Sequence, residues 1–177
     1  AEASRRYAGT IPPLIPEEER IDLLRRARDY AREAYTLFTE TGEKSRQVEA
    51  LIEIGCACRD WVWRLKQNPQ GGDDPKRLRR ESEDALNKAA ELAKEELLYR
   101  HVDALVNLAW LEFYMLEDDK EIDDKHAIWT AIQRAEEAFP LDAEIEKQPQ
   151  VWAQKGKLHT LKGNLAFREF EQKRESE

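Results

Sequence analysis

Apolar positions along this chain recur with helical spacing. The most apolar stretch, residues 102–116, is interrupted only by Asp103, Asn107 and Glu112. A helix that is apolar on nearly every side is either buried among other helices or spans a membrane. Spanning requires about 18–20 apolar residues, and this run is shorter and interrupted. The pattern therefore predicts a central helix that is contacted on several sides by amphipathic neighbours.

Helix breakers divide the rest of the chain into further periodic stretches. Three prolines within residues 1–16 predict an irregular lead-in over 1–15. Gly42 is expected to end the first helix, and Asp74 to cap the third helix ahead of Pro75. Either a turn near 96–101 or one continuous bent helix joins the third helix to the central one. The predicted helices cover about 16–40, 44–67, 75–95, 102–116, 122–138 and 151 onward. The predicted domain organisation is an irregular lead-in over 1–15, a helical repeat domain over 16–173 and a charged tail over 174–177.

Small residues recur at nearly equal intervals. A glycine inside a helix destabilises it by about 1 kcal/mol relative to alanine, so Gly55 and Gly156 need a packing reason. A close crossing of two helices supplies one, and we expect both glycines at such crossings. A recurrent helical hairpin is typical of an α-solenoid. The spacing predicts an all-α fold of about three stacked antiparallel hairpins. The intervals are 21 positions from Ala34 to Gly55, 20 from Ala89 to Ala109, and 21 from Ala135 to Gly156.

The pattern resembles the tetratricopeptide repeat (TPR) family over roughly residues 20–165. Each interval is about six residues longer than the corresponding interval within the standard unit of about 34 residues. The longer unit is similar to the long repeats of kinesin light chains and of the sensor arrays of STAND-class signalling ATPases. The stretch 34–42 particularly resembles the latter, while Glu112 and Lys155 occupy positions that are usually apolar. The matching residues are Ala27, Ala31 and Ala34; Leu51, Ile54 and Gly55; Ser82, Leu86 and Ala89; Leu105, Leu108 and Ala109; Ile128, Ile132 and Ala135; and Trp152 with Gly156.

The resemblance implies a non-catalytic scaffold for protein–protein interaction, the TPR sensor or partner-binding segment of a larger STAND-type signalling protein. It also implies a groove that binds a protein or peptide. The rival interpretation is that Val106, Trp110 and Phe113, which form one helical stripe, are plain core. The implied groove residues are Glu49, Ile52, Cys56, Arg59 and Asp60; Asp103, Val106, Trp110, Phe113 and Tyr114; and Lys157, with Gln150 and Thr160 beside it on the last helix.

Charge and cysteine content narrow the function classes. The net charge is −8 and the sequence pI is near 5.1, which argues against general nucleic-acid binding. A basic turn at 76–80 is either a solvated helix start or, as an alternative function, a contact for nucleic acid or a regulatory domain. Cys56 and Cys58 lack the spacing of zinc or redox sites. Together with the absence of a secretion signal or membrane span, they indicate a cytoplasmic protein.

Sequence motifs for catalysis are not found. The chain has no phosphate loop, nucleophile elbow or dinucleotide fingerprint, so we expect no enzyme activity, cofactor or metal. Asp123 and His126 alone do not make a metal site. The acidic run within 117–124 is either a solvated loop or a docking patch for a basic partner. By the repeat register the chain opens on the second helix of a hairpin and closes on the first helix of another. We therefore expect either terminal capping or self-association.

Overall fold

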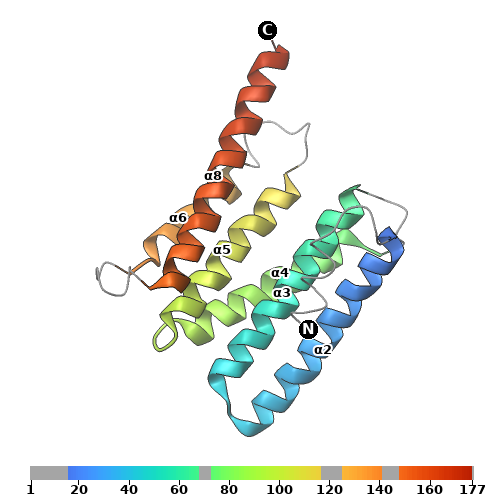
Figure 1. Cartoon of the computed structure of the whole chain (residues 1–177), viewed down its shortest axis with the longest axis vertical. Coiled ribbons are helices and arrows are strands. Elements are labelled where there is room, and N and C mark those ends of the chain that lie inside the picture. Colours follow the sequence, from blue (N-terminus) through green and yellow to red (C-terminus); the bar gives the residue numbers. More distant parts are fainter. Residues whose placement is uncertain (1–15, 68–72, 117–124, 141–147, 177) are drawn as a thin grey trace.

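The computed structural model describes residues 16–67, 73–116, 125–140 and 148–176, and within these ranges it contains α-helices and no strand (Figure 1). The all-α fold class is thus confirmed. The predicted lead-in and the acidic run, including Asp123, lie outside the described residues. The helices are α2 (Glu17–Thr41), α3 (Lys44–Gln67), α4 (Pro75–Ala93), α5 (Leu98–Met115), α6 (Lys125–Glu137) and α8 (Pro149–Ser176).

Local sequence signals account for most helix ends. Gly42 lies in the left-handed region with φ 73°, and the Glu43 amide donates to the Phe38 carbonyl at 3.0 Å, which closes α2. The Asp74 side chain accepts a hydrogen bond from the Lys76 amide at 3.0 Å and caps α4. Both caps confirm the predictions.

The connection between α4 and α5 is a turn over 94–97, so the alternative of one continuous bent helix is wrong. No glycine or proline separates the third predicted helix from the central one, which is why the sequence pattern left both alternatives open. At the other end of the chain, α8 runs on to Ser176, so residues 174–176 of the predicted charged tail are helical.

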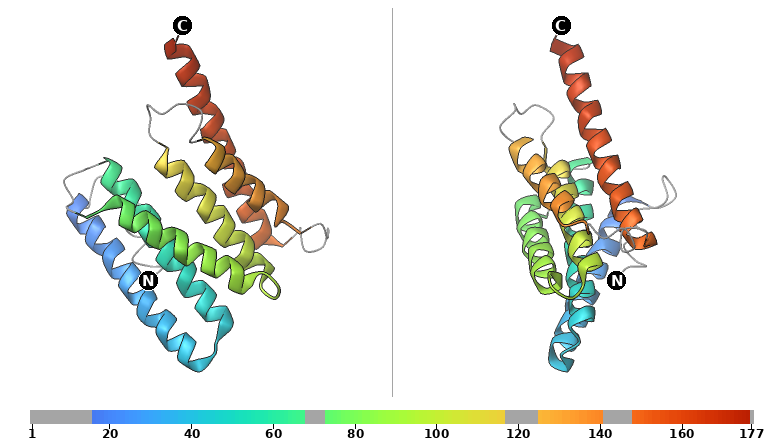
Figure 2. Two further views of the ribbon diagram at one scale, coloured as in Figure 1. Left: turned by 180° about the vertical axis from the view of Figure 1, so that it is seen from behind. Right: turned by 90° about the vertical axis from the view of Figure 1, so that its left-hand side faces the viewer.

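Helices α3 and α5 form the centre of the molecule. Helix α3 packs against α2, α4 and α5, and α5 packs against α3, α4, α6 and α8. The edge-on view in Figure 2 shows α4 and α6 along one side of the bundle and α8 along the other. The predicted central helix is confirmed, since Val106 and Ala109 are fully buried and Leu108 is 6% exposed.

The two glycines expected at close crossings, Gly55 and Gly156, differ in how closely another helix approaches them. A Cβ atom on Gly55 would lie 2.4 Å from the Cγ of Leu86, so α3 and α4 approach each other too closely for a side chain there. The prediction of a close crossing is confirmed at this site. It is wrong at Gly156, where a Cβ atom would meet nothing within 4 Å. Gly156 lies on the exposed side of α8, where no helix among the described residues covers it.

Candidate functional site

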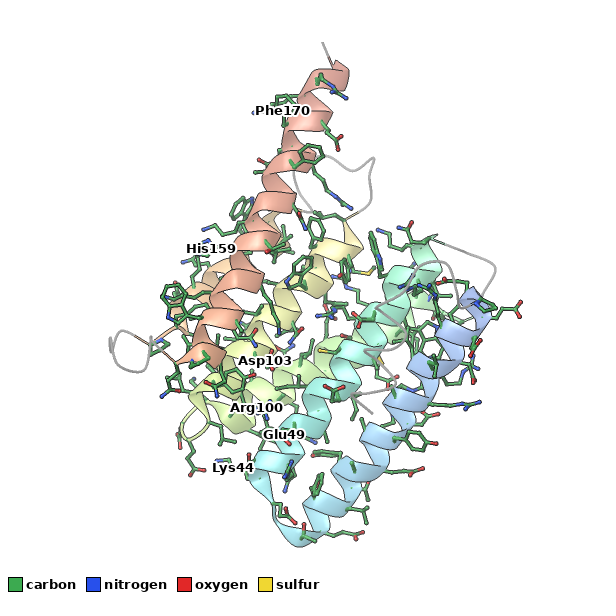
Figure 3. The ribbon with its side chains drawn as sticks, in the orientation of Figure 1. Lys44, Glu49, Arg100, Asp103, His159 and Phe170 are labelled. Carbon is green, nitrogen blue, oxygen red and sulfur yellow. The ribbon has the colours of Figure 1, made fainter. Side chains whose placement is uncertain are left out.

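A groove of about 620 Å³ runs between α3, α5 and α8. Its walls come from helices that are far apart in the sequence, and its floor includes buried side chains of α3 and α5. Figure 3 shows Glu49 on α3 with Arg100 and Asp103 on the facing α5. The groove brings together most of the residues that the sequence pattern predicted for a partner site. These are Glu49, Ile52, Cys56, Arg59, Asp103, Trp110, Tyr114 and Lys157, with Thr160 beside them.

Some predicted site residues do not line the groove. Val106 and Phe113 are buried in the core, as the rival interpretation of the α5 stripe expected, whereas Trp110 of the same stripe is only partly buried and lines the groove. Asp60 lies next to the groove and forms an ion pair with Arg59 at 2.6 Å. Gln150 is exposed at the start of α8 and is not part of the lining.

Sequence reasoning missed five lining residues: Arg46, Glu53, Tyr99, Arg100 and Asn107. Their spacing in the sequence could have identified four of them. Arg46 and Glu53 lie three residues before and four residues after the predicted Glu49, and Arg100 and Asn107 stand in the same relation to Asp103. Residues at such spacings share one helix face.

A chain of polar contacts crosses the groove floor. The buried Arg59 of α3 donates a hydrogen bond to the Asn107 side-chain oxygen on α5. Asn107 in turn donates to the Asp103 carboxylate at 3.0 Å, and Lys157 of α8 lies 3.4 Å from that carboxylate. Three helices are therefore tied together by groups that also face the groove.

Charge is retained on the buried Arg59. Burial by itself lowers the pKa of its guanidinium, but the neighbouring Asp60 carboxylate, together with smaller contributions from Cys56 and Tyr114, outweighs burial and raises the pKa above its ordinary value. The guanidinium also lies 5.7 Å from the centre of the Tyr114 ring. Burial raises the pKa of Tyr114, partly offset by Arg59. The groove floor thus presents a fixed cation and a neutral phenol.

Aromatic rings form one end of the groove. Trp63 of α3 stacks on Tyr114 of α5 with ring centres 4.8 Å apart, and Trp110 lies 5.6 Å from Tyr114. The Arg168 guanidinium of α8 lies 4.5 Å from the Phe113 ring. At the other end Glu49 pairs with Arg46 at 2.9 Å and with Arg100. The groove therefore has an aromatic end and a charged end.

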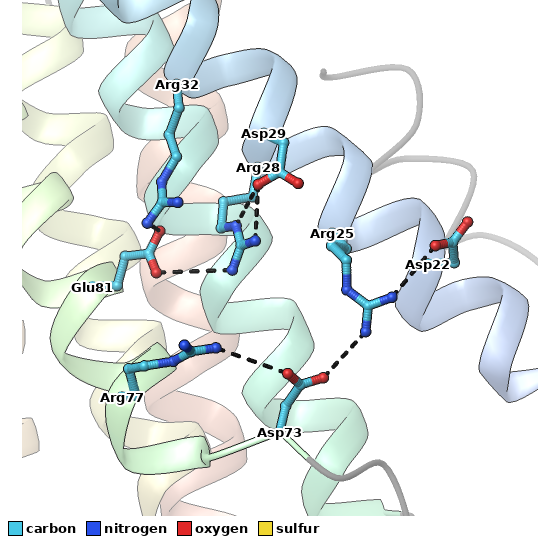
Figure 4. A network of polar contacts seen from close by, with 8 residues as sticks. All are labelled: Asp22, Arg25, Arg28, Asp29, Arg32, Asp73, Arg77 and Glu81. Carbon is cyan, nitrogen blue, oxygen red and sulfur yellow. Dashed lines mark hydrogen bonds and ion pairs between the residues drawn. The ribbon is translucent and has the colours of Figure 1, made fainter.

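A second cleft of about 560 Å³ lies between α2, α3 and α4 and includes part of the basic turn. Many of its cations are neutralised by nearby acids. Figure 4 shows Arg28 and Arg32 of α2 directed at Glu81, with Arg32 at 2.6 Å, and Arg77 directed at Asp73 at 3.8 Å. The cationic lining residues are Arg28, Arg32, Arg77, Arg80 and Lys88, against Glu81 and Asp84.

The structure also places the cysteines and the side chains that could bind a metal ion. Cys56 and Cys58 are buried, and burial raises the pKa of the Cys58 thiol. Among the residues whose positions are described, His, Cys, Asp and Glu side chains do not gather in groups of three or more that could hold a metal ion. Within the same ranges, none of the helices has both the length and the apolar character needed to cross a membrane.

No family model, curated protein or solved structure matches this chain. Its function is therefore argued from the sequence pattern and from the geometry of the groove.

Proposed function

We propose that the chain is a non-catalytic protein-interaction module whose groove between α3, α5 and α8 binds a peptide segment of a partner protein. The observation that carries this proposal is the convergence of the predicted positions. Eight residues assigned to a partner site from the repeat register, spread from Glu49 to Lys157, line one continuous groove.

The helix packing supports a TPR-like solenoid as the architecture of this module. Helices α3, α5 and α8 carry Gly55, Ala109 and Gly156, the second small residue of each interval, and α3 contacts α5 just as α5 contacts α8. Helices α4 and α6 each follow one of these helices and pack against it. Stacked hairpins of this kind place equivalent helices side by side and create an extended concave surface.

The lining chemistry indicates the kind of peptide. Trp110 and Tyr114 offer a partly exposed aromatic surface of the type that anchors interfaces. Lys157, with its side chain 49% exposed, offers a cation above the groove floor. We therefore propose a segment that places an apolar side chain at the aromatic end and hydrogen-bonding groups along the Asp103–Lys157 pair.

Selection from a displayed random-peptide library against the immobilised chain tests this proposal. The affinity of an enriched peptide is then measured for the parent chain and for Trp110→Ala and Lys157→Glu. We expect both variants to weaken binding by about tenfold or more, because each removes a contact group from the groove. Trp129→Ala, on the exposed surface of α6, is the matched control and should bind like the parent.

Thermal unfolding of the same variants separates a binding role from a packing role. Lys157→Glu places a second carboxylate near Asp103, so we expect a lower melting temperature, and binding is compared well below the melting temperature of each variant. Trp110 contacts Phe113 and Tyr114, so its loss costs some stability. If selected peptides bind all variants equally, the groove is not the binding site.

The resemblance to long-repeat sensor arrays leads us to propose that this module serves as the partner-binding segment of a larger signalling protein of the STAND type. The sequence of the full-length gene product tests this directly. An ATPase domain in the same polypeptide would support the proposal, and a full-length product without one would contradict it.

The second cleft, between α2, α3 and α4, supports a second candidate function, the binding of nucleic acid or an acidic regulatory domain. Five cations face two acids in its lining, in a chain whose net charge is −8. Binding through phosphate contacts would weaken steeply as salt rises. Titration of single- and double-stranded oligonucleotides at two salt concentrations, with Arg80→Glu as the variant, tests this candidate.

A further inference from the structure

The outer face of α8 is an uncovered helix surface with an unusual arrangement of residues. Trp152, Phe167 and Phe170 on this face are 62%, 60% and 61% exposed. Leu51 and Leu105, which match Trp152 in the proposed repeat register, are each only 4% exposed. Gly156 and Gly163 lie on the same face, and a Cβ atom on either would meet nothing within 4 Å. This face is built like a buried one but lacks a partner helix among the described residues.

The exposed residues form one straight stripe. Successive members are separated by four, three, four, four, three and four positions, which keeps them on one side of a helix. The order of spacings reads the same in both directions, and Gly163 is its centre. The stripe spans about 33 Å at the rise of an α-helix. Its members are Trp152, Gly156, His159, Gly163, Phe167, Phe170 and Arg174.

We propose that this stripe pairs with the same stripe of a second copy of the chain, antiparallel and about a two-fold axis at Gly163. In that arrangement large residues of one copy face small or complementary residues of the other. Phe170 lies over Gly156 of the second copy, where a missing side chain leaves space. Phe167 faces His159, and Arg174 lies over the Trp152 ring as a cation–π pair. A two-fold interface must be self-complementary in this way.

The charges of α8 leave the stripe clear for such pairing. Lys157 is directed at Asp103 of its own bundle, and Lys162 lies 2.7 Å from Glu136 on α6. These two lysines are thus paired with acids of their own bundle, which reduces the repulsion between two copies of α8. Figures 1 and 2 show that α8 extends beyond the other helices, and Figure 3 places Phe170 on this extension. The bundle therefore does not obstruct the C-terminal half of the stripe.

The surface area that the stripe can bury is of the order that a reversible dimer needs. An aromatic side chain can bury about 150–250 Å². At their observed exposure, the three aromatics of the stripe offer about 270–450 Å² per copy, and the glycines bring the two backbones close. A standard interface buries about 800 Å² per partner, so the aromatics alone supply roughly a third to a half of it.

Cysteine cross-linking tests the proposed axis. Gly163→Cys places two thiols together at the axis, so we expect a covalent dimer on mild oxidation. Gly156→Cys is the matched control, because its thiols would be about 21 Å apart, beyond disulfide reach. A mixture of Gly156→Cys and Phe170→Cys chains should cross-link to each other. The native Cys56 and Cys58 are buried and do not compete.

Light scattering tests the interface without a cross-link. We expect the parent chain to reach twice its 20.7 kDa mass as concentration rises. Phe170→Asp should raise the dissociation constant about tenfold or more while leaving the helical circular dichroism unchanged, since the side chain is exposed. Tyr30→Asp, on the exposed face of α2, should still dimerise. The proposal is overturned if the chain stays monomeric, if Gly163→Cys does not cross-link, or if Tyr30→Asp dissociates the dimer and Phe170→Asp does not.

Discussion

Gly55 shows at the scale of one residue how a missing side chain determines a helix crossing. The space above its Cα is occupied by Leu86, whose Cγ and one Cδ lie 2.4 and 2.7 Å from the position of a Cβ atom. Leu86 is fully buried and has no solvent to move into. In addition, the Ser82 hydroxyl donates to the Gly55 carbonyl at 2.8 Å across the same crossing.

We expect Gly55→Ala to destabilise the fold by up to about 2 kcal/mol. The overpacking cost of about 1–3 kcal/mol outweighs the gain in helix propensity of about 1 kcal/mol. Denaturant unfolding of dilute protein measures the effect. In a Leu86→Ala background the same change should become neutral or stabilising, because the obstruction is gone. Gly156→Ala is the matched control and should gain up to about 1 kcal/mol. Equal changes in unfolding free energy for Gly55→Ala and Gly156→Ala would contradict the close crossing at Gly55.

Glu112 is a partly buried carboxylate on α5 that lies 3.0 Å from Arg79 of α4. Burial raises its pKa above the ordinary 4.5. The Arg79 guanidinium partly offsets this, and Glu83 adds to it. The folded chain therefore binds a proton here over a pH range in which the unfolded chain has already lost it. Across that range, stability due to this residue falls as pH rises.

We expect the difference in unfolding free energy between the parent and Glu112→Gln to shift against the parent as pH increases from about 4.5 toward neutral. The glutamine keeps an oxygen for Arg79 but carries no buried charge. Urea unfolding of both proteins at several pH values measures the difference, and the comparison cancels the titrating groups that do not interact with Glu112. A difference that stays constant or grows in favour of the parent would show that Arg79 dominates.

At the scale of the element, the start of α4 is stabilised by one short side chain. Asp74 accepts from the Lys76 amide, and Pro75 supplies the backbone angle of a first helical turn. The same segment carries the basic residues of the second cleft, so the cap also positions Arg77 and Arg80.

Asp74→Ala should lower stability by about 0.5–2 kcal/mol, because a helix-start amide loses its acceptor. Asp74→Asn should retain most of the stability, since asparagine is an equally good cap. Thermal unfolding of the three proteins checks this order. If asparagine is as damaging as alanine, the contribution of Asp74 is its charge and not its hydrogen bond.

At the scale of the whole molecule, the helices are unequally supported. Helix α5 packs against four others, whereas α6 packs mainly against α5 and α2 mainly against α3. Backbone amides exchange through local opening, which is rarer where more apolar surface is buried.

We therefore expect hydrogen exchange to be slowest in α3 and α5 and markedly faster in α6. Exchange followed by mass spectrometry on peptides from each helix tests this order. Protection of α6 equal to that of α5 would indicate a single cooperative unit with no weak edge.

The sequence by itself determined the helices and most of their ends. Helix propensity, apolar periodicity, glycine termination and aspartate capping are local properties, so residues such as Gly42 and Asp74 could be assigned without a fold. The register of small residues also identified most of the groove lining. It did so because positions three and four apart share a helix face wherever that helix lies.

Tertiary structure alone decided which side of each helix is covered. Val106 and Trp110 share one helical stripe, yet Val106 is buried and Trp110 is partly exposed and lines the groove. The repeat register predicted equivalent positions for Gly55 and Gly156, yet of the two only Gly55 meets a neighbouring helix among the described residues. Whether a small or apolar residue is core or surface depends on which helix lies against it. That contact is made by residues far away in the chain, so the local pattern does not contain it.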